Sequence, residues 1–299
     1  MSEAYTSFAF ITFKGFLKPL TVISFGCATI ILNSVSLLLY FRRSYGGASP
    51  FGMVFELLTT HIIYSISNIL CFSTILLPTD IHSMIRQNHS LNLFIRTMIQ
   101  LNQQIVSVSS AFIALDRVLV MAVPIKYALY SFSTKLALLA ASVNAVLLGS
   151  LIGSFLFLPD HKFFFNILSI YRYCIFCPTL LMEACLYAVF IFQFRRYQKC
   201  RVNSITKQLT AQRNHIVLFQ MFSHTTLCAI PNWIAAIDWW FIEGSDVEWI
   251  ALYIEPYMST LFATSVLLSS SFTLFKLKPR KNFLKVALTG INSSTLRRS

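Results

Sequence analysis

Seven long apolar stretches constrain the fold of this 299-residue chain more than any other feature. A helix needs about 20 residues to cross the roughly 30 Å core of a bilayer, because each residue adds about 1.5 Å. The stretches run from Pro19 to Phe41, Phe51 to Leu77, Leu91 to Met121, Lys135 to Leu158, Ile170 to Phe194, His215 to Trp239 and Val247 to Phe275. They predict an all-α membrane protein, a seven-transmembrane helix bundle over residues 19–275, with 1–18 before it and 276–299 after it.

Composition separates this chain from soluble proteins and from nucleic-acid binders. Hydrophobic residues make up 56% and charged residues 12%, whereas soluble domains carry about 25% charged residues. The net charge of +13 is typical of proteins that bind nucleic acid, but such proteins do not carry 28 Phe. We therefore expect membrane lipid as a partner and no nucleic acid.

The basic residues gather on one side of the predicted membrane. Eighteen Lys and Arg fall in the connections and tail on that side, against six on the other. The positive-inside rule places the basic side in the cytoplasm, so an odd number of spans leaves residues 1–18 outside and 276–299 inside. The multi-pass topology predicts a plasma membrane protein.

Asn88 begins the tripeptide Asn88-His89-Ser90, a possible glycosylation site. The tripeptide lies in a connection that the charge rule places outside the cell.

Asp116 and Arg117 close the third apolar stretch, followed by Val118, Pro124 and Tyr127. Neighbouring opposite charges at a membrane boundary neutralise each other, and the guanidinium can still bind other groups. Two interpretations stay open: a conformational switch, or a simple anchor in which Arg117 marks the cytoplasmic end of the helix.

The Asp-Arg-Val pattern with Pro and Tyr at this spacing resembles the inner end of the third helix in rhodopsin-like G-protein-coupled receptors. In the sixth stretch, Cys228-Ala229-Ile230-Pro231 is similar to the Cys-Trp-x-Pro of that superfamily, where the proline kinks a helix that moves on activation. The resemblance implies a G-protein-coupling switch at Asp116, Arg117, Val118, Pro124 and Tyr127, and a hinge at Cys228 and Pro231.

Other hallmarks of the superfamily are absent. Ser269-Ser270-Ser271-Phe272 stands where Asn-Pro-x-x-Tyr is usual, and the second stretch lacks its Asp. This combination most resembles nematode serpentine chemoreceptors of class BC. That resemblance implies a chemosensory receptor that binds a small-molecule ligand in the outer half of the bundle and couples to a heterotrimeric G protein. A sensory cilium is one candidate location.

The tail beginning at Lys278 combines basic and apolar residues as far as Leu288, with Pro279 at a plausible first turn. We expect a short amphipathic helix on the cytoplasmic membrane surface. A disordered basic tail is the alternative.

Polar residues inside the apolar stretches are the candidates for a ligand pocket. They are Gln100, Gln103, Gln104 and Ser107 in the third stretch, and Glu183, His224 and Glu255 in later ones. Ionisable groups within a membrane are costly and commonly functional. They bind a ligand, or they pair internally with one another or with a tyrosine. Ile99 stands where amine receptors carry an Asp, which argues against an amine bound in the usual way.

Two other function classes are weighed against a receptor. A transporter or channel for a small polar solute would also place ionisable groups in the membrane, but the chain lacks repeated halves. An enzyme is not expected, because no H-E-x-x-H or G-x-S-x-G motif occurs. No cofactor or metal is expected either, since the cysteines lack zinc-ligand spacing.

Overall fold

The computed structural model describes residues 17–44, 52–76, 89–123, 126–127, 130–157, 177–199, 215–234 and 248–277. Nearly all of these residues are helical, and none of them is in a β-strand. This is the expected outcome for an apolar chain, because a helix satisfies its backbone hydrogen bonds internally where water is absent.

The helices follow one another along the chain in long, similar units. They are α2 (Lys18–Ser44), α3 (Gly52–Ser73) with the 3-10 turn η2 (Thr74–Leu76), α5 (His89–Ala122), α7 (Phe132–Phe157), α9 (Cys177–Lys199) and α12 (Glu248–Leu277). Residues 215–234 are also helical and contain the π turn η4 (Thr225–Ala229). We call these residues the η4 segment.

Among the described residues, five helices are long and apolar enough to cross a membrane. These candidate spans are Lys18–Phe41, Gly52–Ser73, Thr97–Ala122, Phe132–Ser150 and Tyr257–Lys276. The chain is thus a multi-pass membrane protein whose described residues are helical. Two predicted stretches, in α9 and the η4 segment, are helical but are not among the five.

The fifth predicted stretch extends further than expected at its end. The described helix α9 runs to Lys199, beyond the predicted end at Phe194. Arginine is a good helix former, so Arg195 and Arg196 extend the helix. The predicted start at Ile170 lies outside the described residues.

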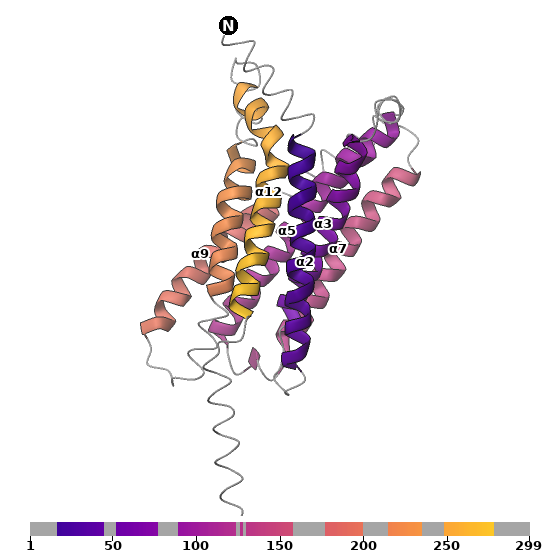
Figure 1. The fold of residues 1–299 in the computed structure, drawn as a ribbon. Coiled ribbons are helices and arrows are strands. Elements are labelled where there is room, and N and C mark those ends of the chain that lie inside the picture. Colours follow the sequence, from indigo (N-terminus) through magenta and orange to yellow (C-terminus); the bar gives the residue numbers. More distant parts are fainter. Residues whose placement is uncertain are drawn as a thin grey trace, which may run out of the picture.

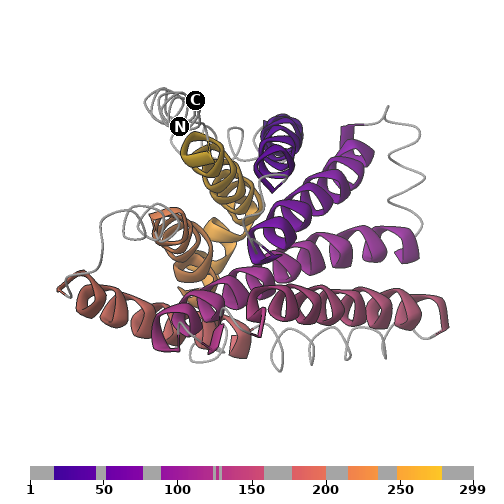
Figure 2. The same ribbon diagram turned by 90° about the horizontal axis from the view of Figure 1, so that it is seen from below.

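Helix α5 lies at the centre of the bundle. It contacts α3, α7 and α9, and Figure 2 shows it crossing the molecule between the other helices. Of its apolar window, 61% is buried, against 28% for α2 and for α7. Helices α2 and α12 lie side by side (Figure 1) and also contact each other. A shift of α5 would therefore directly affect its packing against α3, α7 and α9.

The largest core cluster joins five helical segments around α5. Its buried members are Met53, Val54, Leu57 and Leu58 of α3, Ile113 and Ala114 of α5, Leu136 and Ala140 of α7, Tyr187 and Phe190 of α9, and Val217 and Met221 of the η4 segment. Their packing brings α9 and the η4 segment into the same core as α3, α5 and α7.

Replacing Phe190 by Ala tests this packing. Phe190 is 0% exposed, whereas Phe192 of the same helix is 69% exposed. We expect Phe190→Ala to destabilise the folded bundle by about 3–5 kcal/mol through lost contacts and a cavity. Thermal unfolding of the purified protein in detergent measures the loss. Phe192→Ala is the control and should change the midpoint little; equal losses would show that Phe190 is not a core residue.

Candidate functional site

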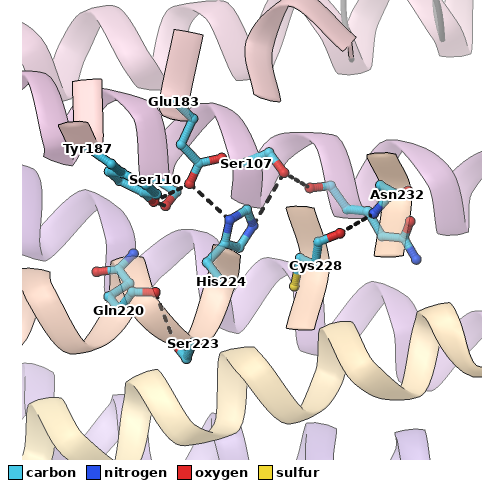
Figure 3. Close-up of polar contacts among 10 residues, drawn as sticks. Ser107, Ser110, Glu183, Tyr187, Gln220, Ser223, His224, Cys228 and Asn232 are labelled. Carbon is cyan, nitrogen blue, oxygen red and sulfur yellow. Dashed lines mark hydrogen bonds and ion pairs between the residues drawn. The ribbon is translucent and has the colours of Figure 1, made fainter. Parts of the chain in front are cut away.

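A buried acid and a buried histidine meet across α9 and the η4 segment. The carboxylate oxygen Oε1 of Glu183 lies 2.9 Å from Nδ1 of His224, and both side chains are at most 3% exposed. Charged groups inside a membrane protein are costly unless they are paired. This contact ties the two helical segments together (Figure 3).

Hydroxyl groups connect this pair to the central helix α5. Tyr187, one turn after Glu183, donates a hydrogen bond to Oε1 of Glu183, and its hydroxyl oxygen lies 2.6 Å from Oγ of Ser110. On the other side, Nε2 of His224 lies 3.4 Å from Oγ of Ser107. Ser107 and Ser110 are three residues apart and therefore share one face of α5. We call Ser107, Ser110, Glu183, Tyr187 and His224 the central polar site.

The imidazole of His224 lies between two helices. Its Nδ1 lies 2.9 Å from Oε1 of Glu183 without forming a hydrogen bond, and its Nε2 lies 3.4 Å from Oγ of Ser107. The hydroxyl of Ser107 also donates to the carbonyl oxygen of Gln103 at 3.2 Å. The ring of His224 therefore contacts α9 and α5 at the same time.

The helix widens directly after His224. The N–H of Ile230 bonds the carbonyl of Thr225, five residues earlier, which makes the π turn η4. Pro231 follows and has no N–H to donate, and the side-chain amide of Asn232 donates to the carbonyl of Cys228 at 2.8 Å. Such turns often occur at functional sites. The predicted hinge at Cys228 and Pro231 therefore coincides with an irregular helix geometry.

Several buried polar atoms near the site have no hydrogen-bond partner among the described residues. They are Oε2 of Glu183, Nδ1 of His224, Oε1 of Gln220 and Nε2 of Gln104. All four residues are at most 4% exposed. An unsatisfied buried polar group costs about 1–3 kcal/mol, so a molecule that bonds to these atoms would be stabilised by them.

Ser107, His224 and Glu183 are a serine, a histidine and an acid in contact, the residue types of a serine hydrolase triad. In such enzymes a histidine takes the proton of a serine that attacks the substrate. Here Ser107 is 0% exposed and already donates to the Gln103 carbonyl. Its position inside a continuous helix also occupies the nearby backbone N–H groups. The arrangement fits a coupling of helices better than acyl transfer.

A second buried polar cluster joins α3, α5 and α7. Oε1 of Glu56 accepts hydrogen bonds from Ser109 at 2.7 Å and from Thr60 at 3.0 Å, and Asn144 donates to Ser109 at 3.0 Å. The sequence interpretation missed Glu56, and also the buried His61 that lies 3.5 Å from Ser270. The signal available in the sequence was a lone acid or imidazole within an otherwise apolar stretch, as for Glu183.

The predicted switch residues meet at the end of α5. Arg117 Nη2 lies 2.9 Å from Asp116 Oδ2, and both side chains are at most 5% exposed. Tyr127 donates a hydrogen bond to the other oxygen of Asp116. Burial first, and then the charge of Asp116, raise the pKa of the Tyr127 phenol, so this donor stays protonated. Nε of Arg117 has no hydrogen-bond partner among the described residues.

The remaining predicted residues fall in several places. Gln100 is exposed, Gln103 is half-buried and Val118 packs against the largest core cluster. Pro124, Asn88 and the tail helix at 278–288 lie outside the described residues, as does the side chain of Glu255. Of the seven predicted pocket residues, the structure brings three together, because His224 contacts both Ser107 and Glu183.

Comparisons with protein families and with curated proteins found no match. Within the described residues, no group of three or more His, Cys, Asp or Glu is placed to hold a metal ion. The chemistry of the site is therefore argued from its own residues.

Tyr127→Phe tests the contact at the end of α5. The change removes one hydrogen bond to a buried carboxylate, and we expect a loss of about 1–3 kcal/mol in unfolding free energy. Tyr130 is the matched control, because it is 57% exposed and also packs against Phe132. Thermal unfolding compares the two variants. A Tyr127→Phe midpoint equal to that of Tyr130→Phe would contradict a stabilising role for the Tyr127 hydroxyl.

Proposed function

We propose that this chain is a seven-transmembrane, G-protein-coupled chemosensory receptor for a small-molecule ligand. The observation that carries the proposal is the buried Glu183–His224 contact, which joins α9 to the η4 segment directly before the π turn and Pro231. A polar contact in this position can hold a deformable helix in one arrangement, and a ligand that competes for it can release that helix.

A continuous helix connects this site to the predicted switch. Ser107 and Ser110 contact the site on α5, and Asp116 and Arg117 lie near the end of the same helix. Nine residues separate Ser107 from Asp116, which is about 14 Å along a helix. The η4 segment also packs on α5 through Val217 and Met221, in the core cluster that contains Ile113. Movement of this segment would repack α5 between the two sites.

The proposed mechanism is a shift between two packings of the same helices. In one, His224 binds Glu183, and Arg117 is held by Asp116. In the other, ligand occupies the outer half of the bundle, the η4 segment moves about its π turn, and Arg117 becomes accessible to a heterotrimeric G protein. Ligand shifts the equilibrium only as far as it binds the second state more tightly.

In the proposed seven-span topology, α9 and the η4 segment cross the membrane together with the five candidate spans. Their polar residues Glu183 and His224 face each other rather than lipid, as expected for ionisable groups within membrane helices. The positive-inside rule then places Arg117 and the basic 195–213 connection in the cytoplasm. The plasma membrane is the proposed location.

A transporter or channel is the second candidate. Besides Glu183 and His224, the bundle buries Glu56 and His61, and chains of ionisable residues are typical of proton and solute pathways. Uptake of small polar solutes into liposomes that contain the purified protein separates the two functions, since a receptor catalyses no flux.

Signalling by the His224→Ala variant tests the receptor proposal. We expect basal second-messenger output several-fold above wild type, because the contact that holds the η4 segment is lost. The variant is expressed in reporter cells with a panel of G-protein α subunits, and output is normalised to surface level. Adding Arg117→Ala should abolish the increase.

His215→Ala is the matched control, since His215 lies in the same segment but is exposed. It should signal as wild type does. Output from His224→Ala that equals wild type at the same surface level, or that persists without Arg117, would overturn the proposed mechanism.

A further inference from the structure

Two buried side-chain oxygens at and beside the central polar site accept no hydrogen bond from the described residues. Glu183 is 1% exposed and carries one oxygen, Oε2, without a hydrogen-bond partner. Gln220, four residues before His224, adds a second unpartnered oxygen, Oε1. Figure 3 shows Gln220 on the same side of His224 as Tyr187. Of the two ring nitrogens of His224, Nε2 lies 3.4 Å from Oγ of Ser107, whereas Nδ1 lies 2.9 Å from Oε1 of Glu183 without forming a hydrogen bond. The unfilled atoms of Glu183 and Gln220 are acceptors.

Acceptors need a donor, and Glu183 is also negatively charged. A ligand carboxylate or phosphate would be repelled by Glu183 and would have to compete with it for His224. A cationic N–H group meets no such conflict, because it can donate to Oε2 of Glu183 and oppose its charge. The chemistry of the site therefore favours a ligand with a protonated nitrogen.

The ring of Phe262 strengthens this preference. The centroids of the His224 and Phe262 rings are 5.5 Å apart. A cation in the place of the imidazole would thus lie within about 6 Å of an aromatic centroid, which is the range of cation–π attraction.

The sequence that follows His224 is acidic. Between His224 and Lys276 the chain contains Asp238, Glu243, Asp246, Glu248 and Glu255, and no Lys, Arg or His. Acidic residues attract cations and repel anions.

We propose that Glu183 recognises a small organic cation, and that His224 occupies the cation's place when no ligand is bound. This inference rests on the proposed receptor function and names its ligand class. In the described arrangement His224 acts as an internal counterion for Glu183. A ligand ammonium or imidazolium group replaces it there, and His224 is released together with the η4 segment that carries it.

The carboxylate proposed to bind the cation is that of Glu183 in α9. Ile99, at the position of the usual amine-binding Asp in the third helix, plays no part. The size of the cation is limited by the imidazole it replaces, so a primary alkylammonium group or an imidazolium fits the description.

A binding experiment without G protein tests the proposal. The full-length His224→Ala variant is purified in detergent, which leaves a space beside Glu183, and its thermal unfolding is followed with n-butylammonium, n-butanol or butyrate at equal millimolar concentrations. We expect butylammonium to raise the unfolding midpoint by about 2–4 °C. Butanol and butyrate should give no comparable increase.

Two further variants locate the effect at Glu183. Adding Glu183→Gln to His224→Ala should abolish the response to butylammonium, because the charge is removed with little change in shape. Adding Glu56→Gln instead removes a different buried carboxylate and should leave the response intact. If Glu183→Gln yields no folded protein, Glu183→Ala and Glu183→Asp replace it, and only Glu183→Asp should respond.

Equal responses to all three probes, or a butylammonium response that persists without the Glu183 carboxylate, would overturn the cation site. Because no G protein is present, the result is independent of signalling. A Glu183-dependent response from a chain that fails the signalling test would leave the cation site in place and remove the receptor function.

Discussion

Burial of charge in an apolar surrounding is the constraint on which the rest of this structure depends. Glu183 and His224 are both nearly inaccessible, and each would be costly alone. Their contact requires α9 and the η4 segment to lie at a fixed distance, and Tyr187 and Ser110 extend the requirement to α5. Apolar packing holds helices together without choosing one arrangement. The polar contacts specify which arrangement forms.

The same constraint explains how a local change reaches a distant site. Helix α5 carries Ser107 and Ser110 at the central polar site, Ser109 in the Glu56 cluster and Asp116 at its end. Three separate polar clusters thus depend on the position of one helix. The π turn beside His224 interrupts the regular helix of the η4 segment. A molecule that competes for Glu183 would act directly beside this irregular turn.

Much of this fold could be predicted from the sequence, because the length of an apolar stretch limits where a membrane helix can lie. The third stretch was predicted to end at Met121, and α5 ends at Ala122. The fifth stretch was predicted to end at Phe194, but α9 continues to Lys199, because hydropathy alone does not register that Arg195 and Arg196 are good helix formers. Three of the predicted pocket residues lie together in the structure, because ionisable residues in a membrane need partners.

Which residues become partners depends on the rotation and tilt of the helices. The contact between Glu56 and Asn144 could therefore not be inferred from residue spacing.

A double-mutant cycle between Glu183 and His224 tests the central claim most directly. The unfolding free energies of wild type, Glu183→Ala, His224→Ala and the double variant are compared in detergent. If the two side chains hold α9 and the η4 segment together, the double variant loses little more stability than either single one, and the coupling energy is about 1–3 kcal/mol. Strictly additive losses would contradict the account, because they would show that the two residues contribute independently.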